Sequence, residues 1–245
     1  MTKESTSCTG SRLTVVIPSK NEGETLYMAL LHLNYQQGIE GTRVIVADSS
    51  TEESSKDWIK HSQKVLKNLR IETVEGGYPA KARLEGSKLV TTEYLLFLDA
   101  DMWLWEKGLI ERTIKEADKK NRDLVTTTVE TDPPYNPVYW LFYLSQLFSQ
   151  WLLRNPFAIG GFQLWRTGAY WKLGGYNPEE LFAEDYSLSR RVEPGRFKVL
   201  RREGVYTSAR RFKNKGVLWM VAVMVRSYLN RNNPEFFRKT HGYWD

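Results

Sequence analysis

Two carboxylates, Asp99 and Asp101, follow the apolar run 94–98 with only Ala100 between them. A buried carboxylate is costly unless it is paired with a positive group or bound to a cation. Side chains at positions i and i+2 of an extended segment point to the same side, so the two carboxylates are expected to converge on one point. Such oxygen ligands suit Mg²⁺ or Mn²⁺, which also take a substrate diphosphate as a ligand. The spacing indicates a divalent-metal site, with two structural acids at a strand end as the alternative.

A second acidic pair, Glu184 and Asp185, stands between the apolar residues 181–183 and an expected helix over 185–192. Either acid is well suited to cap the N-terminus of that helix. A carboxylate there is equally suited to act as a general base that takes a proton from a hydroxyl group. The residue types alone leave both roles open.

The elements that must position these acids are apolar strands alternating with amphipathic helices. The strands are continuous apolar runs, which is typical of a parallel sheet covered by helices on both faces. Ligands of such sheets bind outside the carboxyl ends of the strands, where Pro18, Asp48, Asp99 and Asp101 all stand. One site is therefore expected. The predicted strands span 13–19, 42–50, 70–75, 94–98 and 123–130, and predicted helices between them end near 38 or span 52–69, 80–89 and 107–119.

Two further helices, predicted over 138–153 and 216–229, are strongly apolar. Both fall short of the roughly 20 residues that cross a bilayer. They are expected to pack in the core, to face a second subunit or to lie in a membrane interface.

The net charge of +6 is unevenly distributed over the 245 residues. Residues 190–245 hold fourteen Lys and Arg against four Asp and Glu, a net charge of +10, which leaves −4 for the remainder. This balance favours an anionic partner, namely nucleotide phosphates, nucleic acid or an acidic membrane, unless it is only a solvated basic face. The single cysteine, Cys8, and the absence of an apolar stretch in 1–10 predict a cytoplasmic protein.

Several stretches, in this order and spacing, resemble the family 2 glycosyltransferases with the GT-A fold. "VVIPSKNEGETL" is similar to that family's first strand and Pro-x-x-Asn-Glu turn, and "VIVADSSTEES" to its second acidic strand, with Asp48 as the remaining acid. "KARLEGSKLVTTEYLLFLDAD" resembles the Ala-Arg-x-x-Gly stretch that leads into the D-x-D pair. "GGFQLWRTGAYWKLGGYNPEELFAEDYSLSRRV" resembles the acceptor half, and "YTSARRFKNKG" resembles a segment of short members of the family.

The resemblance implies an α/β fold of GT-A (Rossmann-like) type, with a mostly parallel sheet, helices on both faces and C-terminal apolar helices. It implies a single domain over 1–245, in which 12–105 bind the nucleotide sugar, 106–213 form the acceptor and catalytic half, and 214–245 form a C-terminal helix and tail. The activity implied is that of a metal-dependent, inverting hexosyltransferase that moves a sugar from a UDP- or GDP-linked donor to a hydroxyl on a glycan or lipid.

The same resemblance assigns roles to individual residues. Asp185, with Glu184 beside it, would be the catalytic base, and Asp101 with Asp99 would bind Mn²⁺ or Mg²⁺. Arginine suits a bidentate grip on phosphate, so Arg83 or Lys81 would stabilise the departing nucleotide. The nucleotide-sugar contacts implied are Pro18, Glu22, Asp48, Lys81, Arg83, Asp99, Ala100, Arg210 and Arg211. A second double-arginine step, Arg190 and Arg191, is an alternative phosphate contact.

Three alternatives remain. A polyprenyl-phosphate acceptor at the inner face of a membrane would suit the apolar helices and the basic tail, although a phosphate acceptor needs no base at Asp185. A nucleotidyltransferase would carry a glycine-rich loop after the first strand, where "PSKNEGE" has few glycines. A non-catalytic binding module is permitted by the charge, but no nucleic-acid motif appears, so no nucleic-acid partner is expected.

Overall fold

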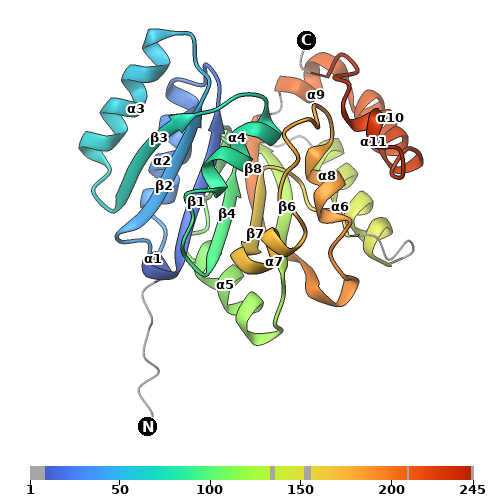
Figure 1. Ribbon diagram of the computed structural model, residues 1–245, viewed down its shortest axis with the longest axis horizontal. Helices are drawn as coiled ribbons and strands as arrows, with labels where there is room; N and C mark the ends of the chain where they lie inside the picture. The colour runs from blue at the N-terminus through green and yellow to red at the C-terminus, as the bar shows by residue number, and fades with distance from the viewer. Residues whose placement is uncertain (1–8, 133–135, 152–155, 209, 244–245) are drawn as a thin grey trace.

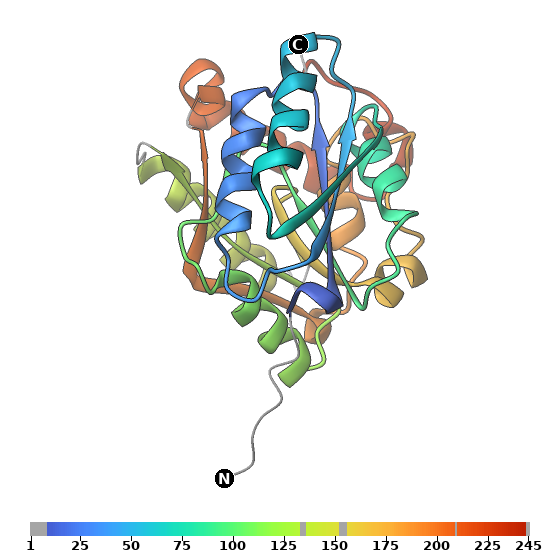
Figure 2. The same cartoon turned by 90° about the vertical axis from the view of Figure 1, so that its left-hand side faces the viewer.

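The computed structural model describes residues 9–132, 136–151, 156–208 and 210–243. It shows one mixed sheet with helices on both faces and a group of C-terminal helices at one side (Figures 1 and 2). The helices and strands follow in chain order: α1 (Thr9–Arg12), β1 (Leu13–Ser19), α2 (Glu24–Asn34), β2 (Thr42–Asp48), α3 (Glu53–Val65), β3 (Leu69–Glu75), α4 (Pro79–Ser87), β4 (Tyr94–Leu98), β5 (Met102–Trp103), α5 (Leu109–Lys119), β6 (Leu124–Asp132), α6 (Asn136–Trp151), β7 (Phe162–Arg166), α7 (Thr167–Lys172), α8 (Glu184–Ser189), the 3₁₀ turn Pro194–Arg196, β8 (Phe197–Ser208), α9 (Arg210–Lys215), α10 (Val217–Leu229) and α11 (Pro234–Phe237).

The strands lie in the order β3-β2-β1-β4-β7-β6-β8-β5. The first four are parallel, as the sequence predicts, and β6 is parallel to β8. Strand β7 runs antiparallel to both of its neighbours, and β5 runs antiparallel to β8. The carboxyl ends of β1, β2 and β4 therefore open toward one edge, where loops are free to bind a ligand.

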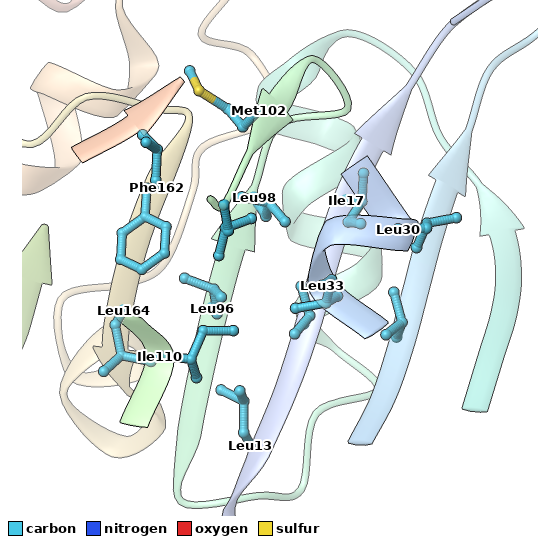
Figure 3. Close-up of a cluster of buried hydrophobic side chains, with 14 of the residues drawn as sticks. Leu13, Ile17, Leu30, Leu33, Leu96, Leu98, Met102, Ile110, Phe162 and Leu164 are labelled. Atoms are coloured by element: carbon cyan, nitrogen blue, oxygen red, sulfur yellow. The ribbon is translucent and has the colours of Figure 1, made fainter. Parts of the chain in front are cut away.

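Successive side chains of the central strands point to opposite faces of the sheet, and both faces are buried. This explains the apolar runs in the sequence. On β1, Leu13, Val15 and Ile17 face a core formed with α2, α3 and α5 (Figure 3). Val16 faces the opposite core, formed with α4, α7 and α8. Because helices cover both faces, most positions along the strand are apolar, and the buried hydroxyl of Thr14 accepts a hydrogen bond from that of Thr92 at 2.9 Å.

The apolar helices α6 and α10 pack against each other on the side of the molecule opposite α3 (Figure 1). Gln146 of α6 faces the sheet and donates its side-chain N–H to the carbonyl of Thr127 at 3.2 Å. This bond ties α6 to β6, while Leu144 and Phe148 remain exposed. Within the described ranges, no helix has the length and hydropathy needed to cross a membrane.

The C-terminal segment is packed rather than loose. His241 lies against the rings of Phe182 and Phe236 and is hydrogen-bonded through Nε2 to the carbonyl of Phe236 at 2.8 Å. Aromatic packing and this hydrogen bond therefore fix the position of His241.

Candidate active site

A cavity of about 1190 Å³ opens at the carboxyl ends of β1 and β4 and continues between α6 and α10. Most of the predicted site residues line it, although they come from distant parts of the chain. These are Pro18, Glu22, Arg83, Asp99, Ala100, Asp101, Glu184 and Asp185.

The two acids after β4 lie in a turn, not in an extended segment. The N–H of Met102 donates to the carbonyl of Asp99 at 3.1 Å, which closes the turn over Ala100 and Asp101. Asp99 accepts a hydrogen bond from Nη2 of Arg83 at 2.6 Å, and Asp101 accepts one from the hydroxyl of Thr207 at 3.2 Å. The expected i, i+2 geometry is therefore wrong in detail, yet both carboxylates line the cavity.

The chemistry of this donor set fits Mg²⁺ or Mn²⁺. Carboxylate oxygens are the hard ligands that these ions prefer, and both ions keep open positions for water and phosphate. The described residues contain no group of three or more His, Cys, Asp or Glu side chains placed to hold a metal ion. A metal at Asp99 and Asp101 would therefore depend on a diphosphate and water for its remaining ligands.

Arg83 joins the two acidic pairs. Its side chain is 3% exposed, and Nη1 donates to Glu184 at 2.5 Å while Nη2 holds Asp99. Burial opposes its positive charge, but the nearby carboxylates outweigh that effect and hold the pKa of Arg83 well above its ordinary value. Helix α4 brings Arg83 this deep because Gly86 lies directly on Val16 of β1, where a Cβ would come within 2.4 Å of Cγ1.

Asp185 is held differently from Glu184, because backbone groups bind its carboxylate. Its two oxygens accept backbone N–H groups of Gly160 at 2.8 Å and of Tyr186 at 2.7 Å. Burial and the neighbouring Glu184 carboxylate raise the pKa of Asp185 to about 7, against the opposing effect of Arg83. Such a carboxyl group exchanges a proton near neutral pH, as a general base must.

The turn before Asp185 contains an unusual backbone conformation. Ala183 has φ 48° and ψ 37°, in the left-handed region that residues with a Cβ rarely adopt. Non-glycine residues in this region collect at functional sites, where surrounding structure enforces them. Ala183 lines the cavity beside the acidic pair.

Asp48 and Asn21 organise the loops at the donor end. Oδ1 of Asp48 accepts the hydroxyl of Ser50 at 2.7 Å, and Oγ of Ser50 accepts the N–H of Asn21 at 2.8 Å. Asn21, itself at φ 55°, accepts the N–H of Thr51 at 2.9 Å through Oδ1. Asparagine tolerates this conformation, so the residue ties the loop after β1 to the loop after β2. Asp48 does not line the cavity, whereas its neighbour Ser49 does.

The remaining predicted cations lie elsewhere. Lys81 is exposed on α4 and does not line the cavity. Arg191 is 3.7 Å from Glu180, and neither it nor Arg190 reaches the cavity wall. Arg210 and Arg211 begin α9, but their side chains lie outside the described part of the structure.

Sequence reasoning missed several residues of the site. Gly160, whose N–H holds Asp185, and Thr207, whose hydroxyl reaches Asp101, both lie in segments with a family resemblance but carried no predicted role. The apolar wall contributed by Phe182 and Tyr228 was missed too. Its signals in the sequence were the apolar residues 181–183 and the apolar character of the helix predicted over 216–229.

Comparison with known proteins defines the class. The model of the family described as "Glycosyl transferase family 2" matches residues 14–174, which include the strand ends, Arg83 and both acids of the D-x-D pair. The chain belongs to this family.

Individual relatives are more distant. The chain is 32% identical over 114 residues to the uncharacterized glycosyltransferase YfnE of Bacillus subtilis (strain 168), a match that covers 46% of this chain and 29% of YfnE. S. aureus TarS has a TM-score of 0.66 at 19% identity, covering 95% of this chain and 45% of TarS. The mannosyltransferase PcManGT from Pyrobaculum calidifontis, solved with GDP-Man and Mn²⁺, has a TM-score of 0.64 at 17% identity, covering 88% and 64%.

These structures share the GT-A fold with this chain. The chain spans less than half the length of YfnE or TarS. A part of TarS, residues 1–349, has also been solved in complex with UDP-GlcNAc.

Proposed function

We propose that the protein is a metal-dependent, inverting glycosyltransferase that moves a hexose from a UDP- or GDP-linked donor to a hydroxyl acceptor. The observation that carries the proposal is the placement of Asp101, Arg83 and Asp185 along one cavity at the carboxyl ends of the strands. Family membership and fold neighbours solved with UDP-GlcNAc or with GDP-Man and Mn²⁺ support a nucleotide-sugar donor.

At the donor end, Asp101 with Asp99 beside it would hold Mn²⁺ or Mg²⁺, which when bound supplies a Lewis acid for the charge on the diphosphate. Asp99 is paired with the cationic side chain of Arg83, and Asp101 accepts the neutral hydroxyl of Thr207; we assign the direct contact with the metal to Asp101. Backbone and side chains around Pro18 and Glu22 line the same end and would contact the base and ribose.

At the reacting centre, Asp185 would take the proton of the acceptor hydroxyl. The hydroxyl oxygen then attacks the anomeric carbon as the bond to the diphosphate breaks on the opposite side, which inverts the configuration. Backbone N–H groups fix the orientation of the carboxylate. Glu184, held by Arg83, is the positioning partner whose negative charge helps keep the pKa of Asp185 high.

These roles divide the chain as the sequence suggests. Residues 12–105 would bind the nucleotide sugar, 106–213 would supply the base and acceptor site, and 214–245 would cover the acceptor end. The cavity draws its wall from all three segments, which supports this division of labour.

The direct test is calorimetric titration of UDP and GDP, each with and without Mn²⁺, into wild type and Asp101→Asn. We expect metal-dependent binding of one nucleotide that is lost in Asp101→Asn. Asp57→Asn, which neutralises an exposed acid on α3 instead, is the matched control and should bind as wild type does. Failure of both nucleotides to bind wild type under every condition would overturn the proposal.

A further inference from the structure

The cavity does not end at the two acidic pairs. Beyond Asp185 it continues between α6 and α10, where the lining is almost wholly apolar. We name this region the apolar end. Representative side chains are Leu144 and Phe148 of α6, Met224 and Val225 of α10, and Phe182.

The serine hydroxyls of the apolar end are used within the helices. The hydroxyl of Ser145 donates to the carbonyl of Phe142 at 2.9 Å, and that of Ser227 donates to the carbonyl of Val223 at 2.9 Å. A sugar ring placed there would lose water without gaining the hydrogen bonds that sugar recognition requires. The wall instead matches hydrocarbon.

The charged side chains that line the cavity distinguish between a hydroxyl acceptor and a phosphate acceptor. Among the described residues that line the cavity, the cations are Lys20 and Arg83. Lys20 follows β1 at the donor end, and Arg83 is already paired with Asp99 and Glu184. Among these described residues, a phosphate carried to Asp185 would meet the carboxylates of the site and an arginine that is already paired, so a neutral hydroxyl is favoured.

Exposure of the wall indicates that it is built to be covered. Leu144 and Val225 are 53% and 50% exposed although they line a cavity that begins at the acids. Contact with a hydrocarbon chain removes such surface from water at about 25 cal/mol per Å². The same cavity contains Asp185, so a single ligand can meet the base with one end and cover the apolar wall with the other.

We infer that the acceptor is an amphiphile: its hydroxyl-bearing head meets Asp185, and its hydrocarbon chain lies in the apolar end between α6 and α10. This inference rests on the proposed function and names the acceptor class of the same site. Straight-chain glycolipids and isoprenoid-linked sugars share this chemistry.

The test titrates methyl, hexyl and octyl β-glucosides, below their micelle concentrations, into the full chain with UDP or GDP and Mn²⁺ present. We expect the Kd to fall by about fourfold for each methylene group buried. Val225→Asn should raise the Kd of octyl glucoside about tenfold and leave nucleotide binding unchanged. Val65→Asn, at a 44% exposed valine on α3 away from the cavity, is the matched control and should bind as wild type does.

A Kd that does not depend on chain length, or an equal loss in Val65→Asn, overturns the inference. So does light scattering that shows a dimer in wild type and a monomer in Val225→Asn, because a second copy would then cover the wall. Absence of nucleotide binding in wild type would disprove the proposed function. The dependence of the glucoside Kd on chain length would still test the apolar end independently. Geranyl glucoside, run beside the octyl compound, distinguishes isoprenoid from straight chains, and tight binding of either supports the inference.

Discussion

The most informative single group is the Asp185 carboxyl, because its pKa of about 7 ties its proposed role to a measurable profile. A base works only when deprotonated, so kcat/KM should rise with pH through about 7 and level off above it. Asp185→Asn should lower kcat by about 10²–10⁴-fold and abolish this rise. Rates with each candidate donor, measured from pH 5 to 9, provide the check.

Glu180 gives the control for this profile. Burial also raises the pKa of its carboxyl group, but Glu180 bonds the hydroxyl of Ser187 and does not line the cavity. In Glu180→Gln, kcat/KM should still rise with pH through about 7. If this rise disappeared in Glu180→Gln and persisted in Asp185→Asn, Asp185 would not be the base.

A second prediction at the scale of single residues concerns the contribution of Arg83 to stability. Removing one member of a buried ion pair leaves an uncompensated charge, which costs about 3–5 kcal/mol. Arg83→Ala leaves the buried Glu184 without its cation, so its free energy of unfolding should fall by about that range, and Arg83→Lys should recover part of it. Urea unfolding gives the values.

The exposed pair Arg43–Glu72, at 2.8 Å, is the matched comparison. Solvent screens such pairs, so Arg43→Ala should cost no more than about 1 kcal/mol. A loss of similar size in Arg83→Ala would show that Arg83 is not the buried link between the acids.

At the scale of elements, the close approach of α4 to β1 places Arg83, and two glycines allow it to be tested. A methyl group at position 86 would lie 2.4 Å from Val16, on a central strand that cannot move away cheaply. Gly86→Ala should therefore destabilise the fold by about 1–3 kcal/mol. Gly168, in α7, has nothing within 4 Å of an added Cβ, so Gly168→Ala should stabilise by up to about 1 kcal/mol.

Thermal unfolding of both variants measures the difference directly. Destabilisation by Gly86→Ala together with stabilisation by Gly168→Ala would establish that position 86 requires glycine because of its contact with β1, and not because of the helical conformation. Equal stabilisation by the two alanines would contradict the tight α4–β1 packing.

The elements also mark the limit of what the sequence could predict. Strands β1, β2 and β4 were predictable because helices cover both faces and the central residues of each strand form an apolar run. Strand β8 was not, since its charged residues hide its pattern and its ladder with β6 is broken by an irregularity at Thr127/Thr128. Such a strand is defined by its partner, which local patterning cannot reveal.

The same distinction holds for the candidate site. The spacing of Asp99 and Asp101 drew attention to the correct turn, but their different partners depend on residues 16 and 106 positions away. The link from Arg83 to Glu184 spans 101 positions. Single residues that could take part in a reaction can be recognised in the sequence, whereas the partners they meet depend on the tertiary fold.

For the whole molecule, charge and apolar surface coincide in the C-terminal part of the chain. Leu218 and Leu229, at the two ends of α10, are 85% and 69% exposed and do not line the cavity. They belong to the segment 190–245, whose net charge is +10. An amphiphilic acceptor would be drawn from a lipid layer, so we propose that this side of the molecule rests on an anionic membrane surface.

Co-sedimentation with vesicles tests this contact. We expect binding to vesicles that contain anionic lipid, weak binding to neutral ones, and release at high salt, because each Lys or Arg near the surface contributes about 1 kcal/mol that is screened within a Debye length. Replacing Leu218 and Leu229 together by Asn should reduce binding at fixed salt, since each leucine that enters the interface adds about 1.5–3 kcal/mol. Val65→Asn again provides the control, being exposed on α3 at the opposite side of the molecule. Vesicle binding that depends neither on lipid charge nor on the double replacement would contradict membrane contact through α10. The acceptor would then have to reach the apolar end from solution.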